Sequence, residues 1–171
     1  MSDDVLIRQA SPADIDEVVS IDDDACALYD QVGLHFDIGP DHPFAQAEHA
    51  RWARAANDGN VFLAARAGSP PVGVLVMGRV DGLAYIDQLS VRMRAMRQGV
   101  GRRLLMRANE WAGSEELWLT TYAHLPWNKA FYERHGFVSV PESACPPGIV
   151  ADLEEQRRWL PDPHQRIAMR R

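Results

Sequence analysis

The sequence lacks several features that would define a function outright. It has two cysteines, Cys26 and Cys145, which are far apart and form no CxxC pattern, so we expect free thiols rather than a disulfide or a metal site. It has no long apolar run, and its acidic start, MSDDVLIRQA, is unlike a secretory signal or a membrane span. These absences predict a cytoplasmic protein that does not use a membrane.

The histidines and the basic residues also lack the patterns of metal and nucleic-acid sites. His35, His42 and His49 are spaced seven apart, which is a poor geometry for holding one metal ion on a helix, so no metal is expected. The formal net charge is −6, and no basic stretch is interleaved with aromatic residues. This balance argues against nucleic acid as a partner.

Length and charge indicate what kind of chain remains. With 171 residues, of which 46% are hydrophobic, the sequence predicts one globular domain over residues 1–171 with a sizeable core. The first 60 residues carry 13 acidic side chains against three arginines, an excess that would attract a cationic amine. The remaining residues carry 15 Arg and Lys against 11 acids.

Much of that positive charge surrounds a pair of glycines, Gly99 and Gly101. The cluster consists of Arg92, Arg94, Arg97, Arg102, Arg103 and Arg107. Such a cluster suits a ligand with several phosphates. For Arg103 and Arg107, a solvated helix face is an equally good interpretation.

The glycine pair separates an expected strand from an expected helix. Residues 85–91 form a short apolar strand, and helical spacing returns at Val100, Leu104, Leu105, Ala108, Trp111 and Ala112. Two glycines at the start of a helix leave backbone N–H groups unobstructed, where the positive end of the helix dipole favours phosphate oxygens. The stretch therefore predicts a pyrophosphate site.

The residues around the glycines narrow the choice of ligand. A nucleoside-triphosphate loop would continue with Lys and Ser or Thr, but Arg102 and Arg103 follow Gly101. A dinucleotide fingerprint would need a small residue at Leu104 and an acid about twenty positions further on. The remaining interpretation is a loop for the pyrophosphate of coenzyme A, and the pattern resembles the GNAT superfamily of acyl-CoA N-acyltransferases. Met96 stands where that family usually has Gln or Arg.

A second motif, TTYAHLPWNKAFYERHGFVSV, covers residues 120–140. It predicts a short helix that carries Phe131 and Tyr132, a left-handed cap at Gly136, and a last core strand opened by Phe137. This part also resembles the GNAT pattern, and its PWNxxFYERxGF form is similar to one bacterial subgroup of the family. The two motifs together cover roughly residues 61–140 in the family's order.

The other expected elements complete an α/β chain. Ser11 caps a first helix with Pro12 at its first position. An irregular, Gly- and Pro-containing loop follows at residues 28–44 and is interpreted as a substrate-side loop. A helix is expected over 42–57 and strands over 5–9, 61–66, 72–80, 85–91 and 116–122. With the resemblance, these predict a central mixed, mostly antiparallel sheet flanked by helices.

The resemblance implies a coenzyme A site formed by two stretches of the chain. The pantetheine arm would pair with the strand at Leu89, Ser90 and Val91, where backbone N–H groups would polarise the thioester carbonyl. The resemblance places the full coenzyme site at Leu89, Ser90, Val91, Met96, Arg97, Gln98, Gly99, Val100, Gly101, Arg102, Asn128 and Phe131. A helix N-cap role is equally plausible for Asn128.

Two side chains are expected to move protons. Asp87, with the same strand parity as Leu89 and Val91, would accept a proton from the amine, directly or through water. The alternative is a strand-end carboxylate paired with an Arg. Tyr132 would protonate the departing thiolate, since a phenol of pKa ~10 is still protonated when a thiol of pKa ~8.5 must be restored. Its alternative is a core aromatic beside Phe131.

The expected function is acetyl transfer from acetyl-CoA to a small-molecule amine, cationic before reaction, or to a peptide. Transfer would be direct, within a ternary complex and without a covalent acyl-enzyme. Two alternatives remain: an acyl-CoA-binding module without turnover and, less favoured, a nucleotide-dependent oxidoreductase. A homodimer is compatible with this interpretation.

Overall fold

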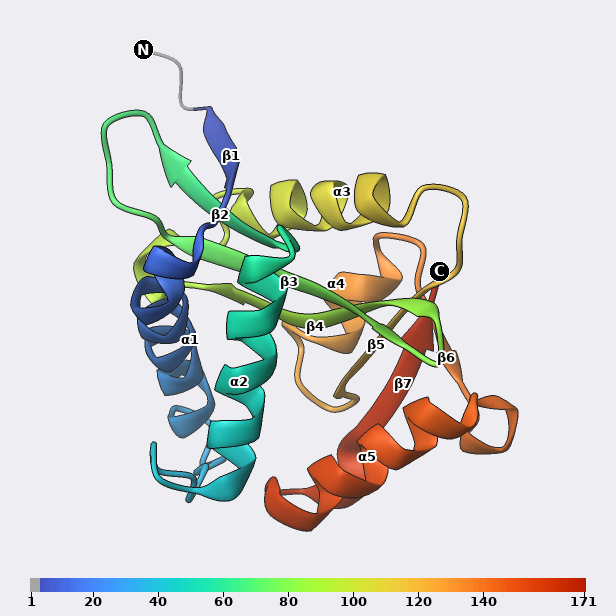
Figure 1. The fold of residues 1–171 in the computed structure, drawn as a ribbon. Helices are drawn as coiled ribbons and strands as arrows, with labels where there is room; N and C mark the ends of the chain where they lie inside the picture. The colour runs from blue at the N-terminus through green and yellow to red at the C-terminus, as the bar shows by residue number, and fades with distance from the viewer. Residues whose placement is uncertain (1–3) are drawn as a thin grey trace. The chain divides into compact units, whose positions relative to one another are not determined.

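A computed structural model describes residues 4–171, and residues 1–3 of the acidic start lie outside this part. The helices are α1 Ile15–Asp30, α2 Pro43–Asn57, α3 Val100–Ala112, α4 Lys129–Glu133 and α5 Pro147–Trp159. The strands are β1 Val5–Gln9, β2 Val61–Arg66, β3 Gly73–Val80, β4 Leu83–Val91, β5 Leu117–Tyr122, β6 Val138–Val140 and β7 Arg166–Arg170 (Figure 1).

The strands form one mixed sheet in the order β1-β2-β3-β4-β5-β7-β6. β4 pairs with β5 in parallel, whereas β1 with β2, β2 with β3, and β7 with both β5 and β6 pair antiparallel. The prediction of a mixed, mostly antiparallel sheet flanked by helices is therefore confirmed. The expected strand over residues 5–9 is β1, which lies at one edge of the sheet.

The chain divides into two compact units. The first unit contains the residues up to Gly78 together with Ile86–Gly113, and the second contains Arg79–Tyr85 and Ser114–Arg171. The prediction of a single domain over residues 1–171 stays a prediction.

In the first unit, helices cover both faces of the sheet. One buried cluster joins Val18 and Ile21 of α1 and Trp52 of α2 to β2 and β3, so both helices lie on the same face. Figure 1 shows α1 and α2 side by side, with α3 running apart from them. On the α3 face, a Cβ at Gly73 would lie 2.7 Å from a side-chain atom of Val100. Glycine at this position allows α3 to pack closely on β3.

The helix starts of the first unit follow from local hydrogen bonds. Ser11 precedes a 3-10 turn, Pro12–Asp14, and its backbone N–H donates to Asp14 Oδ2 at 2.8 Å in a capping box. This turn leads into α1, so the predicted helix start is confirmed with one extra tight turn. The α2 helix begins after His42, whose Nδ1 accepts from the backbone N–H of Phe44 at 3.0 Å.

The second unit contains elements that the sequence patterns did not predict. Its core joins Tyr85 and Trp118 to Ile149 and Leu153 of α5 and to Ala168 of β7. The prediction that Phe137 opens the last core strand is wrong, because β6 has three residues and lies at the sheet edge, with Val138 58% exposed. The last strand is β7, which lies between β5 and β6 and whose five residues begin and end with Arg. So short a strand gives almost no period-2 signal.

Two further expectations concern membranes and thiols. No helix among the described residues is long and apolar enough to cross a membrane. Cys26 and Cys145 are both free thiols, as predicted.

Candidate active site

The glycine pair forms a left-handed turn at the start of α3. Gly99 has φ +83° and occupies the N-cap position, and the first helical bond runs from the N–H of Arg103 to the Gly99 carbonyl at 3.1 Å. The N–H groups of Val100, Gly101 and Arg102 precede that bond, so helix geometry gives them no carbonyl of an earlier turn. They lie at the positive end of the helix dipole, an arrangement that can hold phosphate oxygens.

Side chains tie the residues before this turn to the rest of the first unit. Gln98 donates from Nε2 to the Arg94 carbonyl at 2.8 Å and accepts from Arg66 Nη2 at 2.9 Å. Its amide therefore holds the turn in place. Met96, at the position where the family usually has Gln or Arg, is half-buried. Arg97 is exposed and has φ +61°, a left-handed conformation that is uncommon for a residue other than glycine.

The six arginines around the glycines do not act as one cluster. Arg92 lies against α1, where its Nη2 is 3.1 Å from a Glu17 carboxylate oxygen, and only 14% of its side chain is exposed. Arg94, Arg97 and Arg102 are exposed. These three remain available for a phosphate-bearing ligand near the turn.

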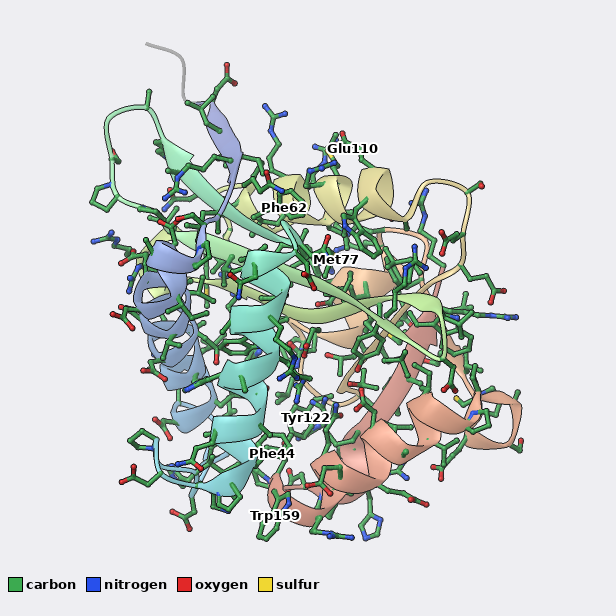
Figure 2. All side chains as sticks on the ribbon, in the orientation of Figure 1. Phe44, Phe62, Met77, Glu110, Tyr122 and Trp159 are labelled. Carbon is green, nitrogen blue, oxygen red and sulfur yellow. The ribbon has the colours of Figure 1, made fainter. Side chains whose placement is uncertain are left out.

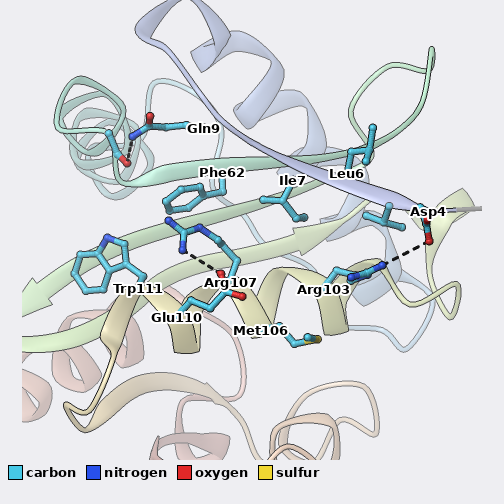
Figure 3. Close-up of a pocket in the computed structure, with 12 residues that line it drawn as sticks. Asp4, Leu6, Ile7, Gln9, Phe62, Arg103, Met106, Arg107, Glu110 and Trp111 are labelled. Atoms are coloured by element: carbon cyan, nitrogen blue, oxygen red, sulfur yellow. Dashed lines mark hydrogen bonds and ion pairs between the residues drawn. The ribbon is translucent and has the colours of Figure 1, made fainter.

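Arg103 and Arg107 belong to a separate surface pocket between β1 and α3 (Figure 3). The pocket has a volume of about 630 Å³. The Arg107 guanidinium lies 4.4 Å from the centre of the Phe62 ring and 3.2 Å from a Glu110 oxygen, and Arg103 lies 3.7 Å from an Asp4 oxygen. Figure 2 shows Phe62 and Glu110 in this region. The helix-face interpretation of these two arginines therefore fits better than a phosphate site.

The predicted base, Asp87, is held by an arginine of α2. Arg51 donates from Nε to Asp87 Oδ2 and from Nη2 to Asp87 Oδ1, both at 3.0 Å. The side chain of Asp87 is 15% exposed and that of Arg51 is 44% exposed. Pairing with an Arg is what the alternative interpretation of Asp87 expected, and a role as base stays a prediction.

The residues after Asp87 bind a carboxylate of α1. Gln88 Nε2 and Ser90 Oγ both donate to Asp22 Oδ1, at 2.7 and 2.6 Å, and Gln88 also donates to Ser90 Oγ at 2.8 Å. We call these five side chains the β4 network: Arg51, Asp87, Asp22, Gln88 and Ser90.

The β4 network links β4 to the two helices that cover this face of the sheet. Asp87 bonds to Arg51 of α2, and Gln88 and Ser90 bond to Asp22 of α1. The prediction that Asp87 shares its side of the strand with Leu89 and Val91 stays a prediction.

Asp22 is the residue of this site that the sequence interpretation missed. Burial raises the pKa of the Asp22 carboxyl, and the hydrogen bonds from Ser90 and Gln88 oppose that shift. Asp22 lies four residues after the buried Val18, so helical spacing placed a carboxyl on the apolar stripe of α1. One turn later, burial and then the neighbouring carboxylates, Asp22 first, raise the pKa of the Cys26 thiol. That thiol is consequently a poor nucleophile at neutral pH.

In the second unit, α4 carries Tyr132 and ends as predicted. Gly136 has φ +89°, the Phe137 N–H donates to the Tyr132 carbonyl at 3.1 Å, and the Gly136 N–H donates to the Glu133 carbonyl at 3.1 Å. These two bonds form a Schellman motif, which confirms the left-handed cap. The half-buried Tyr132 ring lies 5.2 Å from that of Phe131 and 5.6 Å from that of Phe137, centre to centre.

Two other candidates of the second unit have defined positions. Asn128 is 9% exposed and occupies the N-cap position of α4, without a side-chain hydrogen bond to the first turn of that helix. His124 places its Nε2 3.2 Å from an Asp162 carboxylate oxygen. Among residues 4–171, no three His, Cys, Asp or Glu side chains are grouped to hold a metal ion.

Solved structures with similar folds come from several organisms. N-acetylglutamate synthase from Neisseria gonorrhoeae, complexed with coenzyme A and N-acetyl-glutamate, matches with TM-score 0.67 and 18% identity over 100% of this chain and 35% of that chain. The PaiA N-acetyltransferase from Thermoplasma acidophilum, in complex with coenzyme A, matches with TM-score 0.64 and 14% identity over 100% of this chain and 99% of that chain. A GNAT-family acetyltransferase from Bacillus cereus matches with TM-score 0.65 and 13% identity over 98% of this chain and 96% of that chain.

These likenesses establish the fold, and the chain spans about a third of the Neisseria protein. A comparison with family models adds the family. The model described as "Acetyltransferase (GNAT) family" matches residues 29–137, more than half of the sequence and a span that includes both the glycine turn and Tyr132. The chain therefore belongs to the acetyltransferase (GNAT) family.

Proposed function

We propose that the protein transfers an acetyl group from acetyl-CoA to the primary amine of a small molecule, by direct attack within a ternary complex. The observation that carries the proposal is the left-handed Gly99 turn at the start of α3 in a chain of the GNAT family. Relatives of the same fold are known in complex with coenzyme A. Membership of the bacterial subgroup with the PWNxxFYERxGF motif is part of the proposal.

The coenzyme would be held mainly by backbone groups. The N–H groups of Val100, Gly101 and Arg102 would bind its pyrophosphate, with the exposed Arg97 and Arg102 side chains beside them. The pantetheine arm would pair with β4 at Leu89–Val91. The Ser90 hydroxyl already donates to Asp22, so this residue would contribute its backbone. Asn128 and Phe131 are also part of the proposed coenzyme site.

The chemistry requires two proton transfers. Asp87 would accept a proton from the ammonium group, after which the nitrogen forms a bond to the acetyl carbon and the carbon–sulfur bond breaks. Tyr132 would donate a proton to the departing sulfur and regain one from the nitrogen. Of the three ammonium protons, one stays on the amide nitrogen. A second returns to Tyr132 and replaces the proton that it gave to sulfur, and the third passes through Asp87 to solvent.

The acidic first 60 residues support a positively charged reacting nitrogen. Part of that negative charge is neutralised within the first unit, since Asp14 pairs with Arg8, and Glu17 with Arg92. The field that remains favours an ammonium group, whatever the other groups of the acceptor. The Neisseria relative, complexed with N-acetyl-glutamate, supports a small amino compound as acceptor.

Thiol release in the presence of acetyl-CoA and a panel of small amines tests the proposal. We expect release that depends on both the amine and the protein. The half-buried Met96 in place of Gln or Arg favours a second candidate, a module that binds acyl-CoA without turnover. Binding of coenzyme A in a calorimeter without thiol release for any amine would contradict the transferase proposal and support that candidate.

A further inference from the structure

The Arg51–Asp87 pair joins an exposed cation to the carboxylate that we propose as the base. Both oxygens of Asp87 accept from Arg51, and the Arg51 side chain is about three times as exposed as that of Asp87, 44% against 15%. An acceptor that approaches from solvent therefore finds the Arg51 guanidinium more accessible than the Asp87 carboxylate. A purely cationic amine is repelled there and offers nothing to replace Asp87 as a partner of Arg51.

A carboxylate on the acceptor resolves this conflict. Guanidinium groups bind carboxylates through two parallel hydrogen bonds, so an acceptor carboxylate can take the place of Asp87 with the same geometry. The exchange replaces one charge-assisted pair by another of the same kind. It leaves Asp87 without its cation at the moment when the ammonium group of the same acceptor arrives.

We propose that Arg51 is the specificity-determining residue of this site and that the acceptor is an amino acid, with a carboxylate close to its primary amine. Arg51 binds the carboxylate, and Asp87 is freed to accept the ammonium proton. The inference rests on the proposed transferase function and names the chemical class of its acceptor. It also assigns the Arg51–Asp87 pair as the resting state of the site.

The rest of the β4 network supports this exchange. Gln88 follows Asp87 directly, and its amide is another donor of the β4 network that could bind a carboxylate. Asp22 and Ser90 accept from Gln88 Nε2 at 2.7 and 2.8 Å, so that amide is already bound. Of these two donors, Arg51 is the one with the exposed side chain and is therefore the better placed to bind an acceptor carboxylate.

Matched acceptors and matched variants test the proposal. The acceptors are amino acids, the amines that result when their carboxyl group is removed, and their carboxamides. The variants are Arg51→Gln and Arg51→Lys, with Arg54→Gln as control, because Arg54 is an exposed arginine of the same helix. Calorimetry with coenzyme A and thermal unfolding show whether each variant keeps its fold and its coenzyme site.

For the parent protein we expect kcat/KM to be about tenfold to a hundredfold higher for the amino acid than for the decarboxylated amine, as for one charge-assisted pair. Arg51→Gln should remove this preference, mainly by raising KM for the amino acid, and Arg51→Lys should restore part of it. Arg54→Gln should keep it. Equal kcat/KM for the two acceptors in the parent, or an unchanged preference in a folded Arg51→Gln variant, would overturn the inference alone. Absence of thiol release with every acceptor contradicts the transferase function itself, and with it this inference.

Discussion

The glycine turn and the β4 network belong to the same unit, but they are built in different ways. The glycine turn is local: residues 96–101 and the first turn of α3 supply its backbone N–H groups, and one left-handed glycine aims them. The β4 network joins side chains from α1, α2 and β4, up to 68 positions apart in sequence. A backbone site tolerates most side-chain changes and fails when the backbone is obstructed. A side-chain network responds to each of its members separately.

The largest effect should come from obstructing the backbone site. Gly101→Glu places bulk and negative charge beside the N–H groups that we propose for the pyrophosphate, so coenzyme A binding should be abolished. Calorimetry with coenzyme A measures this affinity. Gly39→Glu is the matched control, because a Cβ at Gly39 meets no atom within 4 Å and the same charge is added elsewhere in the unit. Unchanged affinity in a folded Gly101→Glu variant would refute the glycine turn as the pyrophosphate site.

The next largest effect should be on chemistry without loss of binding. Tyr132→Phe keeps the ring that packs on Phe131 and Phe137, so stability and coenzyme affinity should change little. Turnover should fall by ~10² or more if the hydroxyl protonates the thiolate. A thioester with a better leaving group needs less help from an acid, so its turnover should fall less in the variant than the turnover of acetyl-CoA. Tyr122→Phe is the control, since it removes a hydroxyl that donates to the Pro161 carbonyl at 2.7 Å. If turnover of the Tyr132→Phe variant falls by the same factor with acetyl-CoA and with the activated thioester, Tyr132 has a packing role and does not protonate the thiolate.

A smaller effect, dependent on pH, is expected within the β4 network. Asp87→Asn removes the proposed base, so only acceptor that is already deprotonated in solution can react. Turnover should therefore fall most at the acidic end of the working range and recover as pH rises. The pH–rate profile of the variant measures this shift. A profile parallel to that of the parent would mean that Asp87 is structural and that His124 or solvent accepts the proton.

The smallest expected effect concerns stability. Because the pKa of Asp22 is raised in the folded state, ionised Asp22 destabilises the protein as pH rises through that pKa. Asp22→Asn removes the charge and keeps an oxygen that can accept from Ser90 and Gln88. The melting temperature of the variant relative to the parent should therefore increase from pH 4 to pH 8. A relative decrease over this range would show that the ionised form is the favoured one.

The contrast also explains how much the sequence could predict. The boundaries of β2 and α3 and the left-handed cap at Gly136 followed from glycines, caps and apolar spacing, which act over a few residues. The coenzyme turn could be proposed for the same reason. These features need no knowledge of which segments meet in space.

The features that were missed depend on tertiary contacts. Arg51 has no sequence signal that connects it to Asp87, 36 positions later. Asp22 was missed because it stands on the apolar stripe of the first expected helix, and nothing in the sequence distinguishes its carboxyl from the residues around it. β7 was missed because its partners, β5 and β6, both precede it along the chain and its own five residues carry little pattern.

The position of β7 has a consequence for how the second unit forms during synthesis. All five residues of β7 pair with β5, and three of them pair with β6. A ribosome delivers β5 and β6 well before β7, so β6 must wait for a partner that has not yet been translated. The sheet of this unit can close only after residues 166–170 have left the ribosomal tunnel. Until then its apolar strands are exposed, and a pause in translation within α5 prolongs the interval in which they can aggregate.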